Sequence, residues 1–181
     1  MIDANERWLL SYYRHSELGG ALFFGRLARI VRPGRMQHEM TRQFADEARH
    51  ADLWGQCLDG LGHEPARVAE AYQDRYLAVA GCPANLMEIL AVTHVFERRA
   101  FAEYIDHARR QGVHPAVRAT IESLLDDERR HLAWVRRALR DAEREYGADE
   151  VGAAIARYDA ADLEIHSEAR EEFSARLAAR G

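Results

Sequence analysis

One five-residue motif occurs twice in this chain of 181 residues and constrains its fold more than any other feature. Residues 46–50 and residues 127–131 both read Asp-Glu-x-Arg-His. A Glu and a His three positions apart lie about 60° apart around an α-helix, so both side chains can reach one metal ion. The duplication therefore predicts two helices that each carry half of a metal site.

Each motif is preceded by a glutamate on the apolar side of an expected helix. Glu47 follows Glu17 by 30 residues, and Glu128 follows Glu97 by 31. In antiparallel helices joined by a short turn, equal offsets about the turn bring such residues to the same level. The chain is therefore interpreted as an internal repeat with a pseudo-twofold axis, which would place four carboxylates and two imidazoles around two metal ions.

Helical periodicity of apolar residues dominates the chain, and glycines and prolines divide it into segments. Short loops after the first and third long segments predict antiparallel neighbours. The long connection from His63 to Gly81 predicts a crossover that contains a shorter helix. The expected helices cover Asn5–Val31, Arg35–Asp59, Arg67–Val79, Ala84–Arg110, Pro115–Tyr146 and Ala148–Ala179.

Apolar stripes along these helices predict which residues form the core and whether the side chains of the two motifs point inward. Phe44 and Trp54 flank the first motif, so its Glu and His are expected to point inward. Leu124 and Val135 do the same for the second motif. An unpaired buried carboxylate is costly, and a bound cation is the usual remedy. Further inward residues are expected at Leu10, Tyr13, Ala21, Phe24, Ala28, Met40, Leu58, Leu86, Leu90, Phe101, Tyr104, Val117, Ile121, Val151, Ile155, Tyr158, Ile165, Phe173 and Leu177.

Composition excludes several classes of protein. A net charge of −5 gives no basic field for nucleic acid or for an anionic membrane surface. The apolar run Ala21–Phe24 is far shorter than the ~20 residues that a membrane span needs. The N-terminal residues lack a signal-peptide pattern. Two cysteines, Cys57 and Cys82, are too few for a disulfide framework or a cysteine-based zinc site. We therefore expect a cytoplasmic protein without nucleic-acid or membrane partners.

The pattern of glutamates and histidines resembles the ferritin-like, rubrerythrin-like di-iron carboxylate superfamily. The resemblance extends over about residues 4–146 and implies an all-α fold, a ferritin-like antiparallel four-helix bundle with one long crossover. The bundle is expected over residues 1–147. An additional C-terminal helix is expected over residues 148–181, packed on the bundle or in an oligomer contact. The resemblance is carried by a lone Glu on each of two helices and a Glu-x-x-His pair on each of two others: Glu17, Glu97, Glu47 with His50, and Glu128 with His131.

This resemblance implies two iron ions, with manganese or a mixed iron–manganese pair as the alternatives. In similar proteins the glutamates of the Glu-x-x-His pairs lie between the two ions, so Glu47 and Glu128 are expected to bridge them. The remaining ligands are then expected to be Glu17 and His50 for one ion and Glu97 and His131 for the other.

The resemblance also implies roles for the residues beside the ligands. In similar proteins an aspartate at the place of Asp46 and Asp127 accepts a hydrogen bond from the imidazole of the partner helix. Asp46 is therefore expected to hold the histidine of the second motif, and Asp127 that of the first. Arg49 and Arg130 are expected either to pair with these aspartates or to belong to a solvated helix face.

Three further residues are candidates for a role at the metals. His94 lies one turn before Glu97, where rubrerythrins carry an additional carboxylate. It is interpreted as a seventh ligand, a proton donor or a core histidine. Tyr13 and Tyr104 are interpreted as radical or proton donors or as core residues. The other histidines are expected at the surface or at helix caps: His15, His38, His63, His107, His114 and His166.

The resemblance implies an oxidoreductase, and three activities are compatible with it. The first is a non-haem di-iron oxidase or oxygenase that activates O₂ at a Glu₄His₂ site to oxidise a small organic substrate. Gly19 and Gly20 favour this activity because they make room beside the metals, although close helix packing also explains them. The second is a rubrerythrin-like peroxide reductase. It would need an external electron donor, because the Cys-x-x-Cys pairs of a rubredoxin domain are missing.

An iron-storage ferritin is the third activity and the least favoured. The C-terminal helix is far longer than that of a ferritin, and Ala48 stands where bacterioferritins have a haem-binding methionine. The expected partners are therefore O₂ or H₂O₂, a small organic substrate and an external electron donor, and a homodimer is compatible with the C-terminal helix. The sequence leaves open the substrate, the electron donor, the metal and the oligomeric state.

Overall fold

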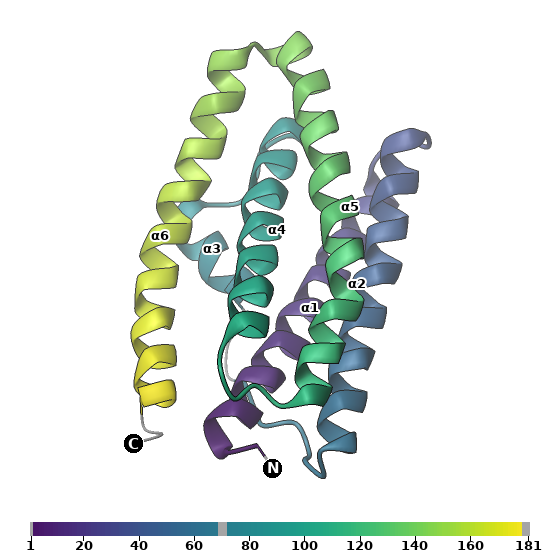
Figure 1. Ribbon diagram of the computed structural model, residues 1–181. Helices are drawn as coiled ribbons and strands as arrows, with labels where there is room; N and C mark the ends of the chain where they lie inside the picture. Colours follow the sequence, from purple (N-terminus) through teal and green to yellow (C-terminus); the bar gives the residue numbers. More distant parts are fainter. Residues whose placement is uncertain (1, 69–71, 179–181) are drawn as a thin grey trace. The chain divides into compact units, whose positions relative to one another are not determined.

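The computed structural model describes residues 2–68 and 72–178, and nearly all of them are helical (Figure 1). No strand occurs within these ranges, so the all-α prediction is confirmed. The helices are α1 (Ala4–Ile30), α2 (Arg35–Gly60), α3 (Tyr72–Ala80), α4 (Leu86–Arg109), α5 (Pro115–Tyr146) and α6 (Ala148–Ala178).

The expected boundaries agree closely except at the crossover helix. Residues 67 and 68 are not helical, residues 69–71 lie outside the described residues, and α3 begins at Tyr72 rather than Arg67. The segment before it is bound to α1: Arg7 donates to the Glu64 carbonyl at 2.7 Å, and the Ala66 amide donates to Ser11 Oγ at 2.8 Å. These bonds hold residues 64–66 in a non-helical segment against α1. The expected end of the last helix at residue 179 also lies outside the described residues.

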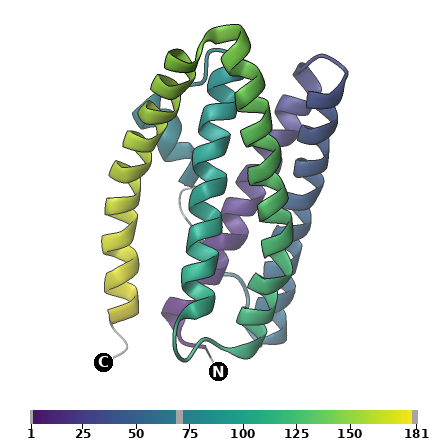
Figure 2. The same cartoon turned by 45° about the horizontal axis from the view of Figure 1, so that its top comes forward.

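The chain divides into two compact units. The first comprises Met1–Gln73, His114–Thr120 and Phe173–Gly181. In it, α1 and α2 form a hairpin and lie side by side in both views (Figures 1 and 2). Asp3 caps α1 by accepting from the Glu6 amide at 2.8 Å. The rings of Tyr13 and Trp54 pack 5.2 Å apart and join the two helices.

The second unit comprises Asp74–Val113 and Ile121–Glu172, so α5 begins in the first unit and continues in the second. Asn85 caps α4 through a bond from the Glu88 amide at 2.9 Å. Gly147 has a φ of 93° and separates α5 from α6, a conformation that a residue with a side chain rarely adopts. Within the described residues, α6 is attached to α4 by the ion pairs Glu88–Arg157, Arg98–Asp159 and Arg99–Asp162. His166 Nδ1 also lies 3.3 Å from Glu103 Oε1.

Asp162 is the most buried of the charged residues that α6 brings to these pairs, with 1% of its surface exposed. Its carboxylate accepts from the Tyr76 hydroxyl of α3 at 2.5 Å and from the Arg99 guanidinium of α4. The Tyr76 ring in turn packs edge-on against Phe96, with centroids 4.4 Å apart. One buried carboxylate therefore joins the crossover helix, α4 and α6.

The expected core is confirmed at most positions and wrong at two. Phe44 is 41% exposed and Leu86 is 37% exposed, although both were expected to face inward. The buried stripe of α2 passes through Gln43 instead, so Phe44 lies at its edge beside Gly25. Leu86 is the first residue of α4. Ala28, Phe101 and Ile155 are half-buried, and the side chains of Phe173 and Leu177 lie outside the described residues.

Among the described helices, none is both long enough and apolar enough to cross a membrane.

We predict that replacing Asp162 by alanine destabilises the second unit much more than replacing Asp159. Asp162→Ala leaves the Arg99 guanidinium without its buried carboxylate, which should cost about 3–5 kcal/mol in the free energy of unfolding. Asp159→Ala breaks the Arg98 pair, whose side chains are 45% and 32% exposed, and should cost about 0–1 kcal/mol. Urea denaturation followed by circular dichroism measures both. Equal losses in the free energy of unfolding for the two variants would contradict the conclusion that Asp162 joins α3, α4 and α6.

Candidate metal centre

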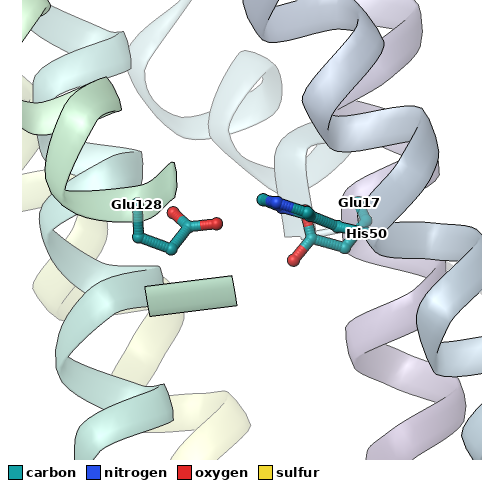
Figure 3. Close-up of side chains that lie close together, drawn as sticks. All are labelled: Glu17, His50 and Glu128. Carbon is teal, nitrogen blue, oxygen red and sulfur yellow. The ribbon is translucent and has the colours of Figure 1, made fainter. Parts of the chain in front are cut away.

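The first half-site consists of Glu17 from α1 and of Glu47 and His50 from α2. All three side chains are buried, with exposures of 6%, 6% and 0%. Glu17 and His50 approach each other, with 3.7 Å between Glu17 Oε2 and His50 Nδ1. Figure 3 shows the side chains of Glu17 and His50 close together. The hairpin of α1 and α2 thus brings two residues that are far apart in the sequence to one buried place.

The second half-site consists of Glu97 from α4 and of Glu128 and His131 from α5. These side chains are buried to the same degree, with exposures of 6%, 2% and 2%. His131 Nδ1 lies 3.4 Å from Glu97 Oε2 and 3.8 Å from Glu128 Oε2. The second half-site therefore repeats the composition of the first on the other pair of repeat helices.

These distances suit a shared cation better than direct hydrogen bonds. The Nδ1 atoms of His50 and His131 are buried and make no hydrogen bond within the described part of the chain, although each faces a carboxylate. Two ligand atoms bound to one ion by bonds of about 2.1 Å lie about 3.0–3.5 Å apart. The observed separations are close to that spacing. Both pairs, Glu17 with His50 and Glu97 with His131, offer ligand atoms within 4.8 Å of each other.

The chemistry of the donor atoms narrows the choice of metal. Each half-site offers two carboxylates and one imidazole, which suit iron or manganese. The only cysteine of α2 is not among these donors. Cys57 interacts with Thr120, and burial raises the pKa of its thiol. The half-sites are therefore rich in oxygen donors and lack the thiolate that would favour zinc or copper(I).

A comparison with protein families identifies the chain. The family model described as Rubrerythrin matches residues 9–139, which include both half-sites. The chain belongs to the rubrerythrin family. No curated protein and no solved structure matches it at a significant level. Membership confirms the predicted ferritin-like, all-α fold, and proteins of this family are generally oxidoreductase-like di-iron proteins. The Glu/His groups of this rubrerythrin-family chain could accordingly hold iron.

The structure adds one residue to the first half-site that the sequence analysis missed. Gln43 is 1% exposed, and its Nε2 atom donates to Glu47 Oε1 at 3.2 Å. Its position one turn before Glu47 on the stripe of Met40 and Trp54 was a signal that could have identified it. Phe44, the large apolar residue beside it, masks this signal in the sequence.

The aspartates and arginines of the two motifs lie beside the ligand candidates in the sequence. Asp127 forms an ion pair with Arg130 one turn further along α5, which is one of the two alternatives expected for this arginine. Asp46 is half-buried and Arg49 is exposed. The expectation that Asp46 and Asp127 hold the histidines of the opposite repeat stays a prediction.

His94 does not join the groups of ligands that the structure brings together within the described residues. It is half-buried, and its charged neighbours are Arg136 on α5, Arg98 on α4 and Asp159 on α6. Its pKa is lowered from the ordinary 6.5, first because burial disfavours the charged imidazolium and then because both arginines repel it. At pH 7 this imidazole is therefore neutral.

The other aromatic and histidine candidates occupy varied surroundings. Tyr13 and Tyr104 are both buried, and Tyr13 packs on Trp54. His107 was expected at the surface or at a cap but is 1% exposed on α4. His114 acts as a cap, because its Nδ1 accepts from the Ala116 amide at 3.3 Å near the start of α5.

We predict that Arg136→Gln raises the pKa of His94 towards 6.5, because it removes a repelling charge. The pH titration of the His94 ring protons by NMR measures the midpoint, with Arg137→Gln on the same helix as control. Since the folded-state pKa is lowered, the contribution of His94 to stability is full above pH 6.5 and is lost as the pH falls through the folded-state pKa. An unchanged midpoint in Arg136→Gln would contradict this placement.

Proposed function

We propose that the two half-sites together hold two iron ions and that the protein reduces hydrogen peroxide with electrons from an external donor. In this proposal Glu17 and His50 hold one ion, and Glu97 and His131 hold the other. Glu47 and Glu128 are proposed to bridge the two ions.

The observation that carries the proposal is the burial of six ionisable side chains at the same positions of two repeats. Removing four carboxylates from water costs several kcal/mol each unless positive charge balances them. Two divalent cations supply that charge, and the imidazoles complete the coordination. The match to the rubrerythrin family supports iron as the metal.

The surroundings of Gly20 favour peroxide over an organic substrate. From the sequence, Gly19 and Gly20 are interpreted either as room for a substrate or as close helix packing. A methyl group on Gly20 would lie 3.2 Å from Glu47 Oε2, so the Glu47 carboxylate itself uses the space that this glycine leaves. Peroxide is small enough to need no separate substrate pocket. The close packing at Gly20 therefore weakens the argument for an oxygenase.

Reduction of H₂O₂ to two molecules of water consumes two electrons and two protons. When bound, the iron ions supply redox chemistry and open coordination positions. The protein residues hold the ions, balance their charge and exclude water by burial. The electrons come from a separate donor, since the two cysteines, Cys57 and Cys82, do not form a Cys-x-x-Cys pair.

An oxygenase that oxidises a small organic molecule is the second candidate. Buried Ala21 and Phe24 follow Glu17 along α1, and half-buried Ala100 and Phe101 follow Glu97 along α4. These residues give each half-site an apolar neighbourhood that could contact a substrate. The reaction with O₂ separates this candidate from the peroxide reductase.

We predict two iron ions per chain in the wild-type protein and none in Glu128→Ala or Glu47→Ala, because both glutamates are expected to bridge the ions. Elemental analysis after anaerobic loading with Fe(II) measures the stoichiometry. Glu122→Ala is the matched control, since Glu122 is an exposed glutamate on α5. Two irons in purified Glu128→Ala would show that the ligand assignment is wrong.

We predict that the reduced, iron-loaded protein is reoxidised by H₂O₂ at least tenfold faster than by O₂ at equal concentrations. Stopped-flow absorbance at several oxidant concentrations gives the two rate constants. Faster reaction with O₂, accelerated by an added organic compound, would instead support the oxygenase. Failure of the wild-type protein to retain iron would contradict both.

A further inference from the structure

One buried hydroxyl group close to the second half-site makes no hydrogen bond. Thr93 of α4 is 1% exposed, and its Oγ1 atom has no hydrogen-bond partner within residues 2–68 and 72–178. A buried hydroxyl loses its bonds to water, and it destabilises the fold unless another partner replaces them. Such groups are rare in folded proteins, so the Thr93 hydroxyl needs an explanation.

The other two threonines of the chain behave differently. Thr41 Oγ1 donates to the Gln37 carbonyl at 2.8 Å, and Thr120 Oγ1 donates to the Ala116 carbonyl at 3.0 Å. Both use the carbonyl one turn earlier, which is a common partner of a threonine within a helix. The Thr93 hydroxyl does not make this bond, so it is available to a bound molecule.

Thr93 lies on the face of α4 that carries Glu97. It precedes Glu97 by four residues, which corresponds to an offset of about 40° around the helix and about 5–6 Å between the two Cβ atoms. Leu90 and Tyr104, seven residues before and after Glu97, are 2% and 3% exposed, so this face of the helix is buried. Thr93 is therefore one helical turn from a ligand candidate of the second half-site, on the same buried face.

The neighbours of Thr93 along this face indicate where its partner binds. A small molecule held in a buried place needs about two to four polar partners. Leu90, on the turn before Thr93, offers no polar side-chain atom, whereas Glu97, on the turn after it, offers a carboxylate. A molecule that accepts from Thr93 therefore finds its other polar partners on the side of the second half-site.

We infer that the Thr93 hydroxyl holds the oxidant at the second half-site by donating a hydrogen bond to it. In the proposed peroxide reductase, Oγ1 donates to an oxygen atom of H₂O₂ beside Glu97. The O–O bond breaks as two electrons from the external donor and two protons convert H₂O₂ into two molecules of water, and the threonine is neither oxidised nor consumed. A hydrogen bond to an oxygen atom that gains negative charge is stronger than one to a neutral atom. This inference rests on the proposed two-metal site and adds a substrate-binding residue to it.

The corresponding position of the first repeat carries a different side chain. Tyr13 precedes Glu17 by four residues, and its ring packs on Trp54 with the centroids 5.2 Å apart. The hydroxyl of a tyrosine lies much further from the backbone than that of a threonine, so the two groups cannot serve equivalent places. The inference therefore concerns the second half-site alone.

Azide binding to the oxidised, iron-loaded protein tests the hydroxyl, because azide is a small anion that accepts hydrogen bonds. Thr93→Val keeps the shape of the side chain but removes the donor. The dissociation constant of azide, measured from the visible absorption of the complex, should therefore rise about 10- to 100-fold. Thr93→Ser keeps the hydroxyl and should bind azide with nearly the wild-type affinity. The rate of reoxidation by H₂O₂ should follow the same order among these variants.

The melting temperature of the metal-free protein gives an independent measurement. Since Thr93→Val removes a buried hydroxyl that has no partner, its melting temperature by circular dichroism should rise by about 2–4 °C. A structural hydroxyl that is completed by an ordered water would instead lower it on removal. Thr41→Val is the control, because the exposed Thr41 hydroxyl already has a partner, the Gln37 carbonyl. It should leave azide binding unchanged and should not raise the melting temperature.

The outcomes separate this inference from the proposed function. If the wild-type protein retains no iron, the two-metal site and the role of Thr93 are both wrong. If folded, iron-loaded Thr93→Val binds azide as tightly as the wild-type protein, only the role of Thr93 is overturned. Weaker azide binding in Thr93→Val, with Thr93→Ser and Thr41→Val close to wild type, supports the inference whether the protein prefers H₂O₂ or O₂.

Discussion

The burial of charge inside two helical hairpins is the constraint on which the rest of this structure depends. Glu17, Glu47, Glu97 and Glu128 are each at most 6% exposed, and the two histidines beside them are buried as well. Helices tolerate such residues on their inner faces only where partners or cations balance the charge. Metal ions held by these residues would balance the charge that the helices bury, which is consistent with membership of the rubrerythrin family.

The attachment of the C-terminal helix α6 depends on another buried charge, the carboxylate of Asp162. Asp162 accepts from Tyr76 and from Arg99, and this connects α6 both to α3 of the crossover and to α4. Arg99 lies two residues after Glu97 and therefore on a different face of α4. In this way α6 stabilises the helix that carries one of the ligand candidates, and its described residues contribute no ligand candidate.

The pseudo-twofold repeat explains both what the two half-sites share and where they differ. The shared part, two glutamates and one histidine in each half, supplies the donors for a metal pair. The two repeats differ at neighbouring positions. Gln43 in the first repeat corresponds to Leu124 in the second, and Gly20 corresponds to Ala100.

Residue spacing alone was enough to predict the long helices, their antiparallel hairpins and the six ligand candidates, because each depends on a period of 3.6 residues. The sequence left open whether Gln43 or Phe44 lies on the buried face of α2. Two neighbouring residues can both lie near the edge of an apolar stripe, so the pattern alone does not separate them. Only packing against α1 decided that Phe44 is exposed and that Gln43 holds Glu47. The charged surroundings of His94 and the contacts of Asp162 likewise needed the tertiary structure, since both join residues from separate helices.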